Sequence, residues 1–124
     1  MKIEYDSTIP IYMQIAESIE EMILEGSLEE GQQVPSTNQL AEYYKLNPAT
    51  ARKGLAILVD NGIIYKRRGV GMFVNEGAVK EVRTKRKNAF VSEYVTVMVE
   101  EARRLNITTD ELIHMIEDLG RRKS

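Results

Sequence analysis

Apolar side chains recur every three or four positions between Pro10 and Gly26, which predicts a helix with one buried face. Proline suits the first turn of a helix, and glycine suits the residue after its end. The apolar positions are Ile11, Ile15, Ile19, Met22 and Ile23. The other faces carry acids that we expect to meet solvent, namely Glu17, Glu20, Glu21 and Glu25. Before this helix, Ile3 and Tyr5 alternate with polar residues as in a short strand.

A second helix is predicted to begin after Ser36. The Ser36 hydroxyl can cap the helix, and Gln39 follows at the spacing of a capping box. The apolar face of this helix consists of Leu40, Ala41 and Tyr44. The helix is short and leads into a turn at residues 45–46.

A third helix is predicted to follow at once. Asn47 can cap it, and Pro48 stands at the first helical position, where its missing N–H costs no hydrogen bond. Its expected buried stripe is Ala51, Leu55, Leu58 and Val59. The residues on or beside the opposite face are Ala49, Thr50, Arg52 and Lys53. Asn61 and Gly62 end the helix, since glycine readily adopts the left-handed conformation.

Two short strands, 63–66 and 72–74, are predicted next. The hairpin tip between them contains Arg67, Arg68, Gly69, Val70 and Gly71, and so carries both glycines and cations. Two helices in tight succession followed by a basic ribbon are typical of a winged helix-turn-helix. The third helix, polar at its start, suits entry into a DNA major groove.

The remainder of the chain predicts two further helices, 89–105 and 109–119. Asn106 and Ile107 separate them, and a capping box spans Thr108–Glu111. A segment of this length, residues 88–124, is below the roughly 40 residues that hold a core alone. We therefore expect two copies to pair, burying Tyr94, Val95, Met98, Ala102, Leu105, Leu112 and Ile116. The predicted fold is mostly α with a small β wing, plus a C-terminal two-helix dimerisation segment.

Charge is distributed unevenly along the chain. The net charge is −2 overall, but residues 1–34 are strongly acidic, whereas 35–74 and 75–87 are both basic. This polarity is expected of a protein that meets DNA with one face. We divide the chain into a DNA-binding domain, 1–75, and a linker with the dimerisation segment, 76–124. The basic residues of the linker either touch flanking phosphates or are only solvated: Lys80, Arg83, Lys85, Arg86 and Lys87.

The sequence gives little support for a metal site, a catalytic site or a nucleotide-binding site. The sequence has no cysteine and one histidine, so no metal-ligand spacing exists, and we expect no metal and no cofactor. His114 and Asp118 are spaced as a helical pair, which could be a proton relay but is more typical of a structural contact. Gly69 and Gly71 lack the third glycine and the following helix of a dinucleotide site. No apolar run is long enough to cross a membrane, so we expect a cytoplasmic protein.

Residues 9–74 resemble the DNA-binding domain of GntR-type bacterial transcription regulators. The motifs that carry the resemblance are Ile11-Tyr12…Gln14-Ile15, Gly31…Val34-Pro35-Ser36, Leu40-Ala41, Thr50-Ala51-Arg52, Leu55…Leu58…Gly62-Ile63-Ile64 and Arg67-Arg68-Gly69-Val70-Gly71…Phe73-Val74. The short segment after Val74 is similar to the YtrA-type subgroup, in which two helices replace a large effector domain. The resemblance implies that the start of the third helix and the wing tip contact DNA.

We therefore expect a sequence-specific transcription regulator, a repressor, that binds a two-fold symmetric site on double-stranded DNA as a homodimer. Thr50 and Arg52 would read base edges, with arginine suited to guanine. Ser36, Thr37 and Lys53 would hold phosphates, and the wing tip would approach the minor groove. Our candidate DNA-binding residues are Ser36, Thr37, Asn38, Asn47, Pro48, Ala49, Thr50, Arg52, Lys53, Arg67, Arg68, Gly69, Val70 and Gly71. The alternative is a winged helix that binds a protein or RNA.

Asn38 departs from the pattern of the GntR type, which usually has arginine at this position. Asparagine is shorter and neutral, and it suits an adenine edge or a single phosphate oxygen. The other interpretation is that Asn38 only decorates the start of a helix. The sequence does not specify the operator or a small-molecule effector.

Overall fold

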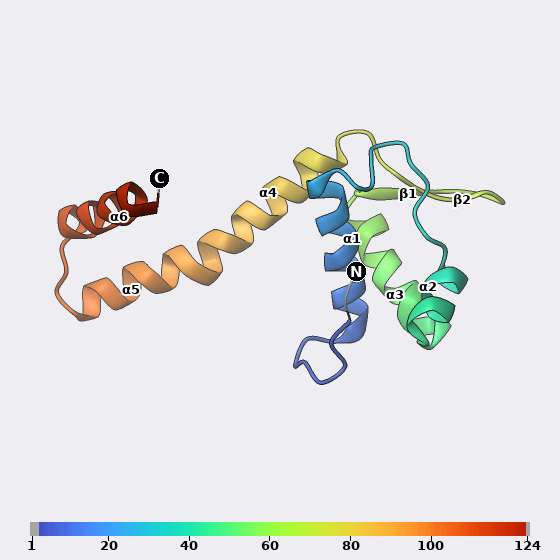
Figure 1. Ribbon diagram of the computed structural model, residues 1–124, viewed down its shortest axis with the longest axis horizontal. Coiled ribbons are helices and arrows are strands. Elements are labelled where there is room, and N and C mark those ends of the chain that lie inside the picture. The colour runs from blue at the N-terminus through green and yellow to red at the C-terminus, as the bar shows by residue number, and fades with distance from the viewer. Residues whose placement is uncertain (1–2, 124) are drawn as a thin grey trace. The chain divides into compact units, whose positions relative to one another are not determined.

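The computed structural model describes residues 3–123. The chain forms two compact units, residues 1–85 and 86–124. In the first unit, α1 (Ile11–Glu25), α2 (Thr37–Tyr44) and α3 (Pro48–Asp60) pack together, with α3 against both of the others (Figure 1). The fully buried side chains include Ile15, Ile19 and Ile23 of α1, and Leu55 and Leu58 of α3. The helical periodicity of the sequence therefore predicted this core correctly.

Helix α1 and helix α3 approach closely at Gly54. A Cβ atom on this residue would lie 2.8 Å from the carbonyl oxygen of Tyr12 and 3.1 Å from the Cβ of Ile15. Glycine thus lets the two backbones come nearer than any side chain would allow. This contact fixes α3, and with it the exposed start of α3, against α1.

Both predicted helix caps are confirmed. The Gln39 amide donates to the Ser36 hydroxyl at 3.1 Å, and the Ser36 amide donates to the Gln39 side-chain oxygen at 2.8 Å. The Ala49 amide donates to the Asn47 side chain at 2.8 Å, and Pro48 follows as the first helical residue. These contacts are local in sequence, which is why sequence patterns predict them well.

The wing consists of β1 (Ile64–Arg67) and β2 (Gly71–Val74), which pair antiparallel. The first strand begins one residue later than predicted. Its register joins Ile64 to Val74 and Lys66 to Met72. A third segment reinforces the ribbon, because the Val34 amide donates to the Met72 carbonyl at 2.8 Å. The wing is therefore tied to the segment that leads into α2.

Three predictions for the first unit are wrong. Val59, expected in the buried stripe of α3, is 37% exposed, whereas Gly54, which was not expected there, is buried. Glu20, expected in solvent, is only 1% exposed. Residues 3–8 contain no strand, since a turn at 5–6 and bends from 7 onward follow residues 3–4, and Gln14 holds this arm by accepting from the Glu4 amide at 2.8 Å.

Helix α4 (Ala78–Phe90) begins well before the expected start at Ala89. Ala78 and Val82 are fully buried in the core of the first unit, so residues 76–85, assigned above to a linker, belong to that unit. The Glu30 carboxylate accepts from the amides of Gly77 and Val79 at 2.9 and 3.1 Å. These amides have no partner within the helix, so Glu30 acts as a cap from a distant part of the chain.

The second unit contains the end of α4, a π-helical turn (Val91–Val95), α5 (Thr96–Arg104) and α6 (Thr109–Lys123). The predicted break is confirmed, since Asn106 adopts a left-handed conformation with φ 59°. The capping box is confirmed too: the Glu111 amide donates to the Thr108 hydroxyl at 3.1 Å. The π turn adds a residue to one helical turn and so shifts the phase of the apolar stripe. Within residues 3–123, no helix combines the length and apolar character needed to span a membrane.

Candidate nucleic-acid interface

The start of α3 presents polar side chains to solvent. Asn47, Pro48, Ala49 and Arg52 are exposed, and Thr50 is half-buried. Across the described residues, the structure shows no acidic partner for Arg52. The guanidinium is therefore available to an external acceptor, and its donors suit a guanine edge or a phosphate.

Lys53 lies differently from its neighbour Arg52. Its ammonium nitrogen stands 4.1 Å from the centre of the Tyr12 ring, at the start of α1. A cation over an aromatic face is attracted by about 0.5–1 kcal/mol at an exposed site. The structure thus directs Lys53 toward α1, an arrangement that sequence spacing did not predict.

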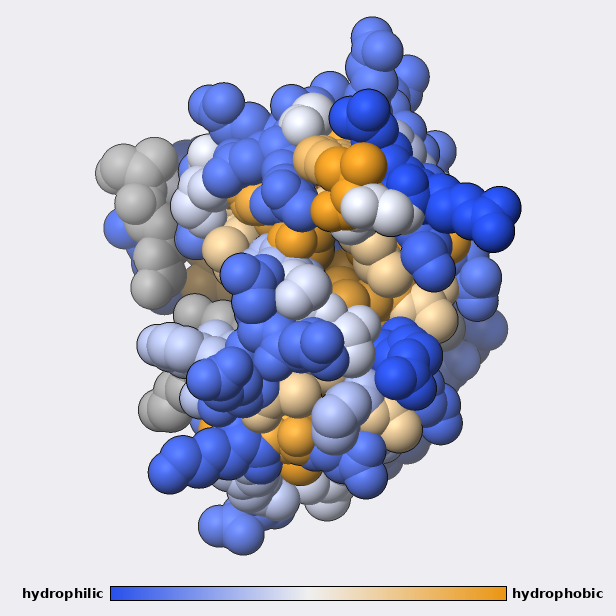
Figure 2. All heavy atoms as spheres, turned by 90° about the vertical axis from the view of Figure 1, so that its right-hand side faces the viewer, coloured by the Kyte–Doolittle hydropathy of each residue, from blue (hydrophilic) through white to orange (hydrophobic). Residues whose placement is uncertain are grey.

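A hollow of about 250 Å³ joins the start of α2, the middle of α3 and the wing; we call it the wing notch. Its residues are Ser36, Thr37, Asn38, Arg52, Leu55, Lys66, Gly71 and Met72. Several predicted DNA-binding residues meet here, although they are far apart in sequence. Figure 2 shows the side of the molecule on which the wing lies, with apolar atoms recessed between hydrophilic side chains.

Lys66 is the one cation of the wing notch that is not among the DNA-binding residues predicted from the sequence. It stands two positions after the buried Ile64 on β1, and alternate residues of a strand point to the same face. Lys66 therefore faces the notch together with Met72, its partner across the ribbon. The period-two alternation from Ile64 was the signal that could have found it.

The wing tip needs its glycines. Gly69 and Gly71 have φ of 77° and 142°, and a Cβ on Gly71 would lie 2.5 Å from the Gln33 side-chain nitrogen. The same Gln33 nitrogen donates to the Val70 carbonyl at 3.2 Å, so this side chain holds the wing tip in place. The guanidinium carbon of Arg67 lies 5.3 Å from the centre of the Phe73 ring. Arg68 is exposed beside these residues at the tip.

Comparison with known proteins agrees with this architecture. Residues 11–74, from the first residue of α1 to the last of β2, match the family described as "Bacterial regulatory proteins, gntR family".

The chain belongs to the GntR family.

Its GntR relatives include two proteins of similar length from Bacillus subtilis. The HTH-type transcriptional regulator YhcF is 30% identical, and the match covers 92% of this chain and 93% of YhcF. The HTH-type transcriptional repressor YtrA is 29% identical, over 97% of this chain and 92% of YtrA. A crystal structure of a GntR-family regulator from Bacteroides thetaiotaomicron is 32% identical, with TM-score 0.79, covering 92% of this chain and 99% of that one. The protein is thus a transcription regulator of the GntR type.

Beyond the GntR domain, most of the predicted pairing residues are exposed in the single chain. Tyr94 is 63% exposed, Met98, Leu105 and Ile116 are also exposed, and Val95 and Leu112 are half-buried. Ala102 is different, because it is only 6% exposed within its own chain. In the described part of the second unit, several large apolar side chains are therefore exposed to solvent.

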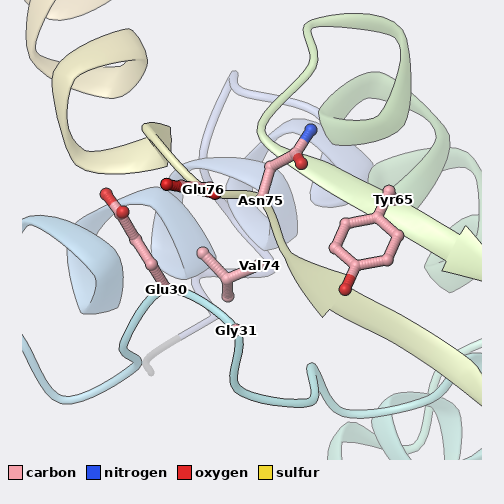
Figure 3. Close-up of a pocket in the computed structure, with 6 residues that line it drawn as sticks. All are labelled: Glu30, Gly31, Tyr65, Val74, Asn75 and Glu76. Carbon is pink, nitrogen blue, oxygen red and sulfur yellow. The ribbon is translucent and has the colours of Figure 1, made fainter.

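A larger hollow, of about 410 Å³, lies beside the wing and the start of α4 (Figure 3). It is lined by Glu30, Gly31, Tyr65, Val74, Asn75 and Glu76. The Glu30 carboxylate points to the start of α4, where its two hydrogen bonds hold the pKa of this group below its ordinary value. Glu30 is thus already engaged in capping, so this hollow is not a free acidic site.

The sole histidine contacts the backbone of its own helix. His114 Nδ1 lies 2.7 Å from the Asp110 carbonyl oxygen, and Asp118 pairs instead with Arg121 at 3.2 Å. The predicted contact between His114 and Asp118 is therefore wrong. In the described part of the chain, no group of three or more potential metal ligands exists.

Proposed function

We propose that this protein is a repressor that binds a two-fold symmetric DNA site as a homodimer. The observation that carries the proposal is the exposed start of α3, where Arg52 has no acidic partner among the described residues and Thr50 lies beside it. Such a helix start supplies both a base-reading side chain and the positive end of a helix dipole. The name of the similar YtrA supports the repressor role.

The homodimer is supported by the apolar surface of the second unit. In the single chain this surface exposes Tyr94, Met98 and Ile116. Exposure of large apolar side chains to water is unfavourable, so a partner that covers them is expected. A two-fold axis that pairs these surfaces would present two α3 helices to half-sites about one DNA turn, or a multiple of it, apart. The DNA site that matches the two-fold symmetry of such a dimer is palindromic.

The roles proposed for single residues follow from their positions. Thr50 and Arg52 read base edges, while Ser36, Thr37 and Lys53 contact the sugar–phosphate backbone. The wing tip, with Arg68 and Gly69, approaches the minor groove. The other candidate residues of the α3 start and the wing belong to the same surface; Gly71 is half-buried, and the exposed ones are Asn47, Pro48, Ala49, Arg67 and Val70.

In-vitro selection of bound duplexes from a random pool tests this function. We expect a palindromic consensus, and a promoter that overlaps this consensus should give less transcript when the protein is added. With Arg52→Ala, affinity for the best site should fall by about 1–3 kcal/mol and base preference should flatten at one position per half-site. Failure to enrich any duplex sequence, with capture of single-stranded RNA instead, would replace this function with RNA binding.

A further inference from the structure

The wing notch concentrates positive charge where three segments of the chain meet. Arg52 of α3 and Lys66 of β1 both line it, and none of its lining residues is acidic. The structure gives neither cation an acidic partner among residues 3–123. Two cations that line one hollow repel each other, and an anion bound in the hollow offsets this repulsion by its attraction to them.

The α2 end of the notch adds hydrogen-bond donors. The capping box engages the amides of Ser36 and Gln39, but not those of Thr37 and Asn38. First-turn amides have no acceptor within the helix and favour an anion together with the helix dipole. Thr37 and Asn38 of α2 and Lys66 of the wing thus line the same hollow.

The floor of the notch is apolar. Its apolar lining residues are Leu55, which is fully buried, and Met72, which is half-buried. A floor of this kind offers no hydrogen bond to a bare, fully hydrated anion, but it can contact the carbon atoms of a sugar. The combination of an apolar floor and a cationic rim matches a deoxyribose with its attached phosphate.

We propose that the wing notch binds one sugar–phosphate unit of the DNA backbone and that Lys66 is its principal cation. This inference rests on the proposed DNA-binding function and deepens it. Lys66 contacts the phosphate, which also accepts from the amides of Thr37 and Asn38, and Arg52 remains free to extend from the rim to a base edge. Lys53 contributes less to phosphate binding, because its ammonium is held over the Tyr12 ring.

Salt titrations of operator binding test the assignment. Lys66→Gln should make the slope of log K against log salt shallower by about 0.9 per subunit, since one phosphate contact is lost. Affinity should fall for all sequences alike, and the selected consensus should not change, because a phosphate carries no sequence information. Lys66→Arg should keep the wild-type slope.

Two variants serve as matched comparisons. Lys45→Gln removes the same charge at the opposite end of α2, outside the notch, and should leave the slope unchanged. Lys53→Ala should reduce the slope less than Lys66→Gln does. Thermal melting should show that Lys66→Gln folds as the wild type does, since Lys66 is an exposed residue on the ribbon.

The outcomes separate this inference from the function on which it rests. A wild-type protein that selects no duplex sequence would refute the DNA-binding function. A wild type that selects an operator, with an unchanged slope in Lys66→Gln, would refute only the role of Lys66. Competition by a millimolar deoxynucleoside monophosphate, lost in Lys66→Gln, would show that the notch takes a free nucleotide instead of the DNA backbone.

Discussion

The carboxylate of Glu20 and the ammonium of Lys85 meet at 2.7 Å, although 65 positions separate them in sequence. The Glu20 side chain is 2% exposed and the Lys85 side chain is 44% exposed. The pair joins α1 to α4 beside the buried Val82. It accounts for a buried glutamate on a helix whose other glutamates are largely exposed, because a buried charge is tolerated when it is paired.

Removal of the cation should destabilise the first unit. Lys85→Met would leave the Glu20 carboxylate buried without this partner, and we expect a loss of about 1–3 kcal/mol. Urea denaturation followed by circular dichroism measures it. Lys80→Met, on the exposed side of the same helix, should change stability by less than about 0.5 kcal/mol. Equal effects of the two substitutions would contradict a structural role for the pair.

The close contact at Gly54 predicts an unfavourable Gly54→Ala. Alanine favours helix by about 1 kcal/mol over glycine, but its Cβ would meet the Tyr12 backbone at 2.8 Å, and such overpacking costs about 1–3 kcal/mol. We expect a net loss of stability in chemical denaturation. Gly120→Ala in α6 is the control, since a Cβ there meets no atom within 4 Å, and it should raise helicity. A stabilised Gly54→Ala would show that α1 can shift at little cost.

The cap provided by Glu30 predicts a dependence of stability on pH. The amides of Gly77 and Val79 lower the pKa of Glu30 in the folded state, so its stabilising effect is present above the ordinary pKa of an unfolded glutamate. It is lost as the pH falls through the lower folded pKa. Urea midpoints of Glu30→Gln should therefore fall less steeply with acid than those of the wild type. Glu42→Gln, at an exposed position of α2, should retain the wild-type pH profile.

The proposed dimer predicts the effect of a charge in the second unit. Met98→Asp would place a carboxylate in the apolar surface that we expect the partner to cover, and should shift the protein toward monomer. Light scattering at micromolar concentration measures the shift. Glu100→Asp on the same helix should leave a dimer. Wild-type protein that is monomeric under these conditions would rule out the homodimer.

Local signals made much of the fold predictable from sequence. Ser36 with Gln39, Asn47 with Pro48, and the glycines and cations of the hairpin tip are each signals from residues a few positions apart. The core stripes of α1 and α3 followed from helical periodicity in the same way. Val59 was misplaced because the buried face of α3 is centred on Gly54, and a glycine carries no hydropathy signal for packing.

The errors and omissions arise where distant segments meet. In sequence, Glu20 resembles the exposed glutamates of α1, and only its contact with Lys85 of α4 distinguishes it from them. Residues 78–85 contain as many cations as apolar residues, so nothing in that stretch alone indicated that it completes a core. Lys66 and Asn38 belong to one hollow only because the wing folds back onto the start of α2.

The burial of Ala78 and Val82 determines where this regulator can be cut and rejoined. A chimera that takes only residues 1–74 would discard the side chains that close the core, the cation that faces Glu20 and the helix start that Glu30 caps. A chimera joined after Lys85 would carry the whole unit. Exchange of C-terminal segments among regulators of this kind therefore has its workable junction inside a helix, not in the loop that follows the wing.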